Sequence, residues 1–225
     1  MRASRAALAL LVSAAVGVAA YHLPWVEHAT AGFTMNGFDL AEWTSLHPAV
    51  RSSTPPLLAT FLLRVPHVAA VLALACAASG LGSARWRAAG WALALVLAAR
   101  FIPPVEFLQS ARSDPNYRQM ALLTGLGVAG VIAVMALHRV VGRWFALCGV
   151  VVFGVGAVAG WAGLSRALVL LDNFEIAVTV GRGVVLYTAA TLGAGAMAVW
   201  EVGRRQRRSK RAINVMSIAA FLFTR

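Results

Sequence analysis

The stretch LLATFLLRVPHVAAVLALACAASGL at residues 57–81 decides the fold class of this chain. It is strongly apolar and carries a single full charge, Arg64. A helix needs about 20 mostly apolar residues to cross the hydrocarbon core of a bilayer, which is about 30 Å thick. The stretch therefore predicts a transmembrane helix. The chain lacks the period-two alternation that is typical of a membrane barrel.

Five other stretches share this character, and the six predicted spans are 6–23, 57–81, 86–102, 120–137, 145–164 and 184–202. Of the 225 residues, 60% are hydrophobic and 12% are charged, whereas a soluble domain has about 25% charged residues. The composition excludes a soluble globule and a disordered chain. We predict an all-α, polytopic bundle of six spans at 1–203, followed by a basic cytoplasmic tail at 204–225.

Two segments allow a second interpretation. Residues 1–23 begin with Arg2 and Arg5 and contain a small-residue site at 18–20, as a cleaved signal peptide does, but the apolar run is longer than a usual signal core. We therefore expect it to remain as the first helix. Segment 164–180 is a seventh apolar candidate, but it carries several charges that are costly at bilayer depth, so it is assigned to a loop.

The charge distribution predicts the orientation. The chain has 20 Lys and Arg residues against 8 acids, a formal net charge of +12. With six spans, 13 of these basic residues and one acid, Glu201, lie on the side of the two termini, and seven basic and seven acidic residues lie on the other. Cytoplasmic loops are rich in Lys and Arg. Both termini are therefore expected on the cytoplasmic side of a prokaryotic cytoplasmic membrane. The excess charge is then an orientation signal, and no nucleic-acid partner is expected.

The basic cluster at 204–211 is expected to attract anionic lipid, since each Lys or Arg near such a surface contributes about 1 kcal/mol. Residues 212–223 are too short to cross the membrane. They either lie along the cytoplasmic leaflet or form a frayed tail.

Three outer loops with short amphipathic segments are predicted at 24–55, 103–119 and 165–183. In the first loop, residues 36–46 predict a short helix that Asn36 caps and that His47-Pro48 ends. This helix either covers an outer cavity or rests at the headgroup boundary.

Ionisable residues within the spans suggest an outward-facing polar cavity, because the bilayer makes such residues costly. Arg64 and His67 are three residues apart and therefore share one helix face. The candidate lining residues are Arg64, His67, Arg100, Glu106, Asp172, Glu175 and Arg182. Such a cavity would hold an anionic headgroup, a quinone or a polar substrate. The alternative is that these residues form structural ion pairs or contact lipid phosphates.

Four histidines fall in the parts of the chain that are predicted to lie on the outer side of the membrane: His22, His28, His47 and His67. Imidazole with nearby carboxylates suits a divalent transition metal, and His22 and His67 could ligate a haem. Neither site has a diagnostic spacing such as His-Glu-x-x-His. We expect no cofactor, and keep haem or a divalent metal as the alternative.

Catalytic motifs are missing from the sequence. The Gly-x-Gly-x-x-Gly spacing at 125–130 lies inside an apolar span with no strand before it, unlike a dinucleotide site. Gly156 and Gly160 form a small-residue step where a helix of this chain, or of a partner subunit, can approach closely.

We expect a non-enzymatic role, as a small transport or assembly component or as the membrane subunit of a larger complex. The alternative is a redox or lipid-modifying membrane enzyme that uses the outer-leaflet His/Glu/Arg cluster.

Overall fold

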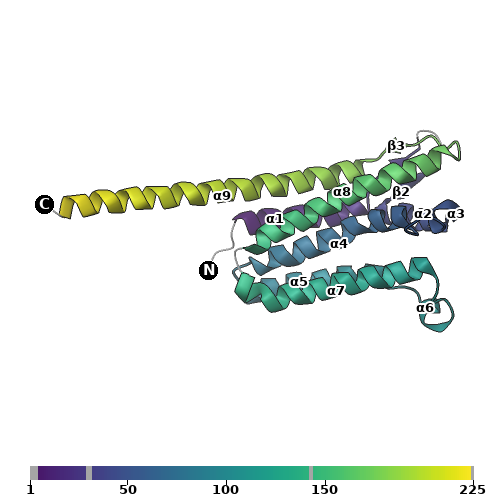
Figure 1. The fold of residues 1–225 in the computed structure, drawn as a ribbon, viewed down its shortest axis with the longest axis horizontal. Helices are drawn as coiled ribbons and strands as arrows, with labels where there is room; N and C mark the ends of the chain where they lie inside the picture. Colours follow the sequence, from purple (N-terminus) through teal and green to yellow (C-terminus); the bar gives the residue numbers. More distant parts are fainter. Residues whose placement is uncertain (1–4, 29–31, 142–143, 224–225) are drawn as a thin grey trace.

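The computed structural model describes residues 5–28, 32–141 and 144–223, apart from the side chains of 141 and 205–223. Each of the six predicted segments is occupied by a long helix (Figure 1). These helices are α1 (Arg5–Tyr21), α4 (Leu58–Ser79), α5 (Ala84–Ala98), α7 (Pro115–Val141), α8 (Phe145–Asp172) and α9 (Arg182–Phe223). The all-α prediction is confirmed, with 79% of the chain helical.

Four of these helices are long and apolar enough to cross a membrane, as expected of a multi-pass membrane protein: α4, α7, α8 and the Arg182–Arg204 part of α9. The apolar α1 is shorter, with 17 residues. Helix α5 has 15 residues and is followed by a 3-10 turn, η1 (Ala99–Phe101). The chain then leaves the helix before the pair Pro103-Pro104, because a proline disfavours helical geometry in the residue before it.

Two helices extend beyond the predicted limits. Helix α8 reaches Asp172, where the sequence predicted a loop from residue 165. Its 28 residues correspond to about 42 Å, which exceeds the hydrocarbon thickness, so its last turns can carry Arg166 and Asp172 outside the apolar layer. Helix α9 continues without a break to Phe223, so residues 204–223 prolong the last helix.

The short elements gather at one end of the bundle, opposite the start of α1 and the far end of α9 (Figure 1). They include the helices α2 (Gly37–Leu46), α3 (Pro48–Arg51) and α6 (Glu106–Gln109). We name this end the loop end and the opposite one the termini end.

A small antiparallel sheet at the loop end was not predicted. Its strands are β1 (Pro24–Glu27), β2 (Thr34–Asn36) and β3 (Thr179–Val180), in the order β2-β1-β3. Val26 of β1 pairs with Met35 on one side and with Val180 on the other. Strands of two to four residues are too short to show alternation, and β3 joins β1 only through the tertiary fold.

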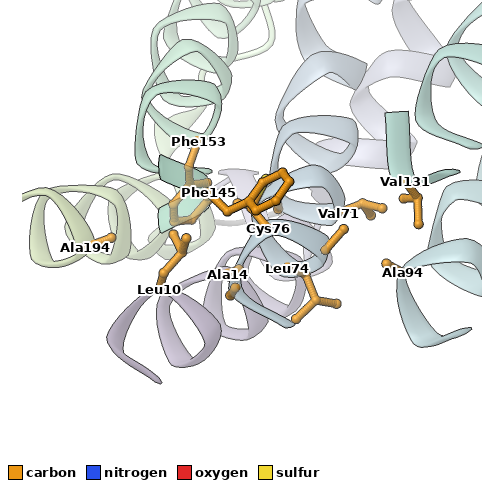
Figure 2. Close-up of a cluster of buried hydrophobic side chains, with 14 of the residues drawn as sticks. Leu10, Ala14, Val71, Leu74, Cys76, Ala94, Val131, Phe145, Phe153 and Ala194 are labelled. Carbon is orange, nitrogen blue, oxygen red and sulfur yellow. The ribbon is translucent and has the colours of Figure 1, made fainter. Parts of the chain in front are cut away.

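Helix α4 lies at the centre of the bundle. Its apolar window is 78% buried, against 22% for the window of α7. Leu10 of α1, Val71 and Leu74 of α4, and Phe145 and Phe153 of α8 belong to one apolar core cluster (Figure 2). The helices around α4 therefore leave much of their surface exposed to the surroundings of the bundle.

Glycines bring α8 close to α4. A Cβ added at Gly156 would lie 2.6 Å from the Cβ of Ala69, and one at Gly160 would lie 3.0 Å from Cγ of Pro66. At Gly163 it would lie 2.8 Å from the backbone nitrogen of Leu63. These distances leave no room for a side chain, so the small-residue face that includes Gly156 and Gly160 packs within the chain.

Candidate functional site

Arg64 of α4 is fully buried and makes three side-chain hydrogen bonds. Its guanidinium donates from Nη2 to Oε1 of Glu42 (2.6 Å) and Oδ1 of Asn116 (2.7 Å), and from Nη1 to Oε1 of Gln119 (3.0 Å). A buried charge is tolerated when it is paired and hydrogen-bonded. The guanidinium therefore links the beginning of α7 and the short helix α2 to the central helix.

Helix α2 holds Glu42 over Arg64, and its predicted boundaries are confirmed. Oδ1 of Asn36 accepts from the backbone N–H groups of Phe38 (2.9 Å) and Asp39 (3.0 Å), and the helix ends at Leu46 before Pro48. Its buried face packs on α4, where the hydroxyls of Thr44 and Thr60 are 3.1 Å apart.

The Glu42 side chain keeps 35% of its surface exposed, while that of Arg64 has none. The ion pair thus runs from the loop end into the bundle. Helix α2 is the element that covers it.

A second ion pair anchors the start of α7. Asp114 accepts from Nη2 of Arg51 (2.7 Å) and from the backbone N–H groups of Asn116 (2.7 Å) and Tyr117 (3.3 Å). Burial acts to raise the pKa of the Asp114 carboxyl, but these hydrogen bonds outweigh it and the pKa lies below its usual value. The pair therefore positions the turn of α7 that carries Asn116 and Gln119.

His67 lies one turn after Arg64 and is also fully buried. Its Nε2 is 3.0 Å from the carbonyl oxygen of Leu97. Because a carbonyl only accepts, Nε2 carries the hydrogen and Nδ1 of the neutral ring is an acceptor. The His67 ring centroid is 5.2 Å from that of Tyr21, 5.9 Å from that of His22 and 5.3 Å from that of Phe101.

Several buried polar atoms around these residues lack a partner. In the described part of the chain, four buried side-chain atoms make no hydrogen bond: Tyr21 Oη, Arg64 Nε, His67 Nδ1 and Thr124 Oγ1. Native proteins leave few such atoms, and three of the four belong to neighbouring residues here. They comprise two hydrogen-bond donors and an acceptor, a set suited to a small polar ligand or ordered water. We name Arg64, Glu42, Asn116, Gln119, Tyr21 and His67 the Arg64 cluster.

Arg100 lies beside this cluster. Its Cζ is 3.9 Å from the ring centroid of Phe38, and Phe38 stacks on Phe101 with centroids 6.0 Å apart. Phe101 also lies 6.0 Å from Cζ of Arg64. The structure therefore brings Arg64, His67 and Arg100 to one region, as the sequence suggested.

The acidic partner differs from the prediction. Glu42 pairs with Arg64, whereas the acids expected to line the cavity, Glu106, Asp172 and Glu175, are exposed residues at the start of α6, at the end of α8 and just after α8. Arg182, at the first residue of α9, is also exposed. The reason is that α2 folds back onto α4, a packing that hydropathy does not report.

Sequence reasoning also missed Tyr21, Asn116 and Gln119. Asn116 and Gln119 are spaced by three just before an apolar run, a signal that could have placed two amides on one helix face. The partnership of Tyr21 with His67 has no local signal.

The histidines of the predicted metal or haem site separate into different places. His22 and His67 are neighbours. The ring centroid of His47, however, lies 5.3 Å from that of Phe174 and 6.4 Å from that of Trp43. His28 directly follows β1. Among the described residues, no group of three or more His, Cys, Asp or Glu side chains is arranged to hold a metal ion.

No protein-family model, curated protein or solved structure matches this chain.

Proposed function

We propose that the protein is a non-enzymatic membrane component, for transport, for assembly or as the subunit of a complex, with a ligand-binding polar chamber at the Arg64 cluster. It has six spans, with both termini in the cytoplasm of a prokaryotic cell. The loop end then faces outward, and the basic stretch at 204–211 lies near anionic lipid of the inner leaflet.

The six-span proposal is supported by helix lengths. Helix α1 is about 25 Å long, and α5 with η1 is about 28 Å. Both lengths approach the hydrocarbon thickness of about 27–30 Å. The orientation is supported by the concentration of Arg and Lys in the segments of the termini end.

Fusions test this topology. Alkaline phosphatase fused after Ser110 or Ile176 should be active, because it would be exported, and fusions after Gly82 or Arg225 should be inactive. The opposite pattern, or activity on both sides of α5, would refute six spans with internal termini.

The observation that carries the chamber proposal is the unpaired set around fully buried Arg64. An ion pair that served only stability could be replaced by apolar side chains, often without cost. It would also not require unpaired polar atoms on Tyr21 and His67 beside it. Helix α2 supplies the carboxylate and covers the chamber, so its movement would open the chamber outward.

The test separates function from stability. Growth of a deletion strain would be measured in competition with strains that carry the wild-type gene, the double variant Arg64→Leu/Glu42→Leu, or the control Glu106→Leu/Arg112→Leu. Membrane levels and thermal stability of each protein would be measured in parallel. The control also removes one acid and one base at the loop end, but both are exposed and neither belongs to the Arg64 cluster.

We expect the first double variant to fold and to lose complementation, and the control to complement. Full complementation by Arg64→Leu/Glu42→Leu, at equal or higher stability, would show that the pair is structural and would refute the chamber.

The second candidate function, a redox or lipid-modifying enzyme, is favoured by one observation. His22, His67 and Tyr21 have adjacent rings, an arrangement able to ligate a cofactor or transfer a proton. A visible absorption band or a stoichiometric metal in the purified protein, lost in His67→Ala but kept in His47→Ala, would favour this enzyme over the non-enzymatic role.

A further inference from the structure

A groove of about 610 Å³ lies at the loop end, beside the small sheet and the start of α9. It is lined by residues of all three strands and of the first turn of α9. These residues are Pro24, Glu27, Thr34, Val180, Arg182 and Val185. The groove is separate from the Arg64 cluster, since no residue of that cluster lines it.

Two opposite charges line this groove without meeting each other. Within the described part of the chain, the side chains of Glu27 and Arg182 form no ion pair or hydrogen bond, either together or with a third residue. The carboxylate accepts hydrogen bonds at two oxygens, and the guanidinium has five N–H donors. The groove therefore offers one anionic and one cationic group to a ligand that carries both charges.

The length of α9 places the cationic group at the edge of the hydrocarbon layer. A rise of 1.5 Å per residue means that about 20 residues cover the hydrocarbon thickness of about 30 Å. Counted back along α9 from Val202, the last apolar residue before the basic cluster, this length ends at Gly183. Arg182 therefore lies at the boundary, and Val185 lies one turn inside the hydrocarbon.

The anionic group lies farther from the membrane than the cationic one. Glu27 of β1 pairs with Thr179 of β3, three residues before Arg182. Figure 1 shows β3 beyond the start of α9, toward the loop end, and three residues of extended chain span up to about 10 Å. The order from the bilayer outward is therefore Val185, Arg182 and Glu27. An amphiphile with an apolar chain, then a phosphate and then an ammonium group has the same order.

The groove opens onto an apolar face of α9 that is exposed to the surroundings of the bundle. Val185, Leu192 and Val199 are spaced by seven residues and share one helix face. Their exposed fractions are 54%, 69% and 75%. This face continues from the groove into the hydrocarbon layer, so it can accommodate an acyl chain, which a soluble zwitterion lacks.

We propose that this groove binds one phosphatidylethanolamine molecule of the leaflet at the loop end. The phosphate lies against Arg182, the ammonium group lies against Glu27, and an acyl chain lies along Val185. Ethanolamine has N–H donors for a charge-assisted hydrogen bond to the carboxylate, whereas choline has none and the glycerol headgroup of phosphatidylglycerol carries no cation. This inference needs the protein to lie in a membrane but does not depend on the role of the Arg64 cluster.

The experiment uses the full-length protein in nanodiscs that contain equal amounts of phosphatidylethanolamine, phosphatidylcholine and phosphatidylglycerol. Native mass spectrometry after release into detergent measures each lipid retained per chain. Glu27→Gln and Arg182→Gln each remove one charge from the groove. Glu106→Gln and Arg112→Gln are the matched controls, because both residues are exposed charges of another loop at the same end.

The wild type and both controls should retain one phosphatidylethanolamine in preference to the other two lipids. Glu27→Gln should lower this preference about fivefold, because the ammonium group loses its partner. Arg182→Gln should lower the retention of all three lipids, because all three carry the phosphate.

Equal retention of the three lipids by the wild type would overturn the proposal, as would unchanged retention in both groove variants or an equal loss in the controls. Soluble phosphoethanolamine, added at the same concentration as the lipid, should not displace it. Displacement would also overturn the proposal, because the groove would then recognise the headgroup without a membrane lipid.

Discussion

Gly163→Ala should destabilise the protein, although alanine is the better helix former. The added Cβ would lie 2.8 Å from the backbone nitrogen of Leu63, 2.9 Å from its Cγ and 3.0 Å from the carbonyl carbon of Leu62. Ordinary contact begins at 3.4 Å, so α8 and α4 would have to separate by about half an ångström. Two of the three atoms belong to the α4 backbone and cannot rotate away.

The magnitude follows from two opposed contributions. Forcing an extra methyl group into a packed interface costs about 1–3 kcal/mol, and replacing Gly by Ala within a helix returns up to about 1 kcal/mol. Because two of the contacts are with backbone atoms, we take the upper part of this range, about 2–3 kcal/mol, and the net loss is then about 1–2 kcal/mol in the free energy of unfolding. Gly154→Ala is the matched control, because it lies in the same helix and its added Cβ meets nothing within 4 Å.

Unfolding in mixed micelles, by SDS titration followed by circular dichroism, measures both variants. Gly154→Ala should be as stable as the wild type or slightly more stable. Equal stability of Gly163→Ala and Gly154→Ala would refute the close approach of α8 and α4 at this level.

Two further predictions concern the loop end. Asp114→Asn should lower stability at pH 7, and its difference from the wild type should shrink as the pH falls below about 4. The reason is that a carboxyl whose pKa is lower in the folded state stabilises the fold above its unfolded pKa and loses this contribution as it is protonated. Unfolding measured at pH 7, 5, 4 and 3 tests this, and a difference independent of pH contradicts it. Asn36→Ala should cost about 1 kcal/mol in the free energy of unfolding, because it removes the cap of α2. The same titration measures it, with exposed Ser52→Ala as the control, and no loss would show that α2 does not need its cap.

The sequence was sufficient where the information is local. Each apolar run became a helix, because only a helix satisfies the backbone polar groups of such a run within itself. The cap at Asn36 and the stop at Pro48 were also predictable, since both act on backbone groups within a few residues.

Only part of the candidate site could be predicted from the sequence, because only part of it depends on local information. Arg64 and His67 were identified because ionisable residues in an apolar helix are costly. Their partners Glu42, Tyr21 and Asn116 come from three other elements, so no spacing along the chain relates them.

The sequence by itself determined six apolar helices, the helical first loop and the charge asymmetry between the two ends, because hydropathy and capping are properties of neighbouring residues. Only the tertiary structure decided that α4 is central, that β3 pairs with β1 and that Glu42 rather than a later acid meets Arg64. These features depend on which helix faces fit together, and glycines such as Gly163 set that fit through contacts about 100 residues apart along the chain.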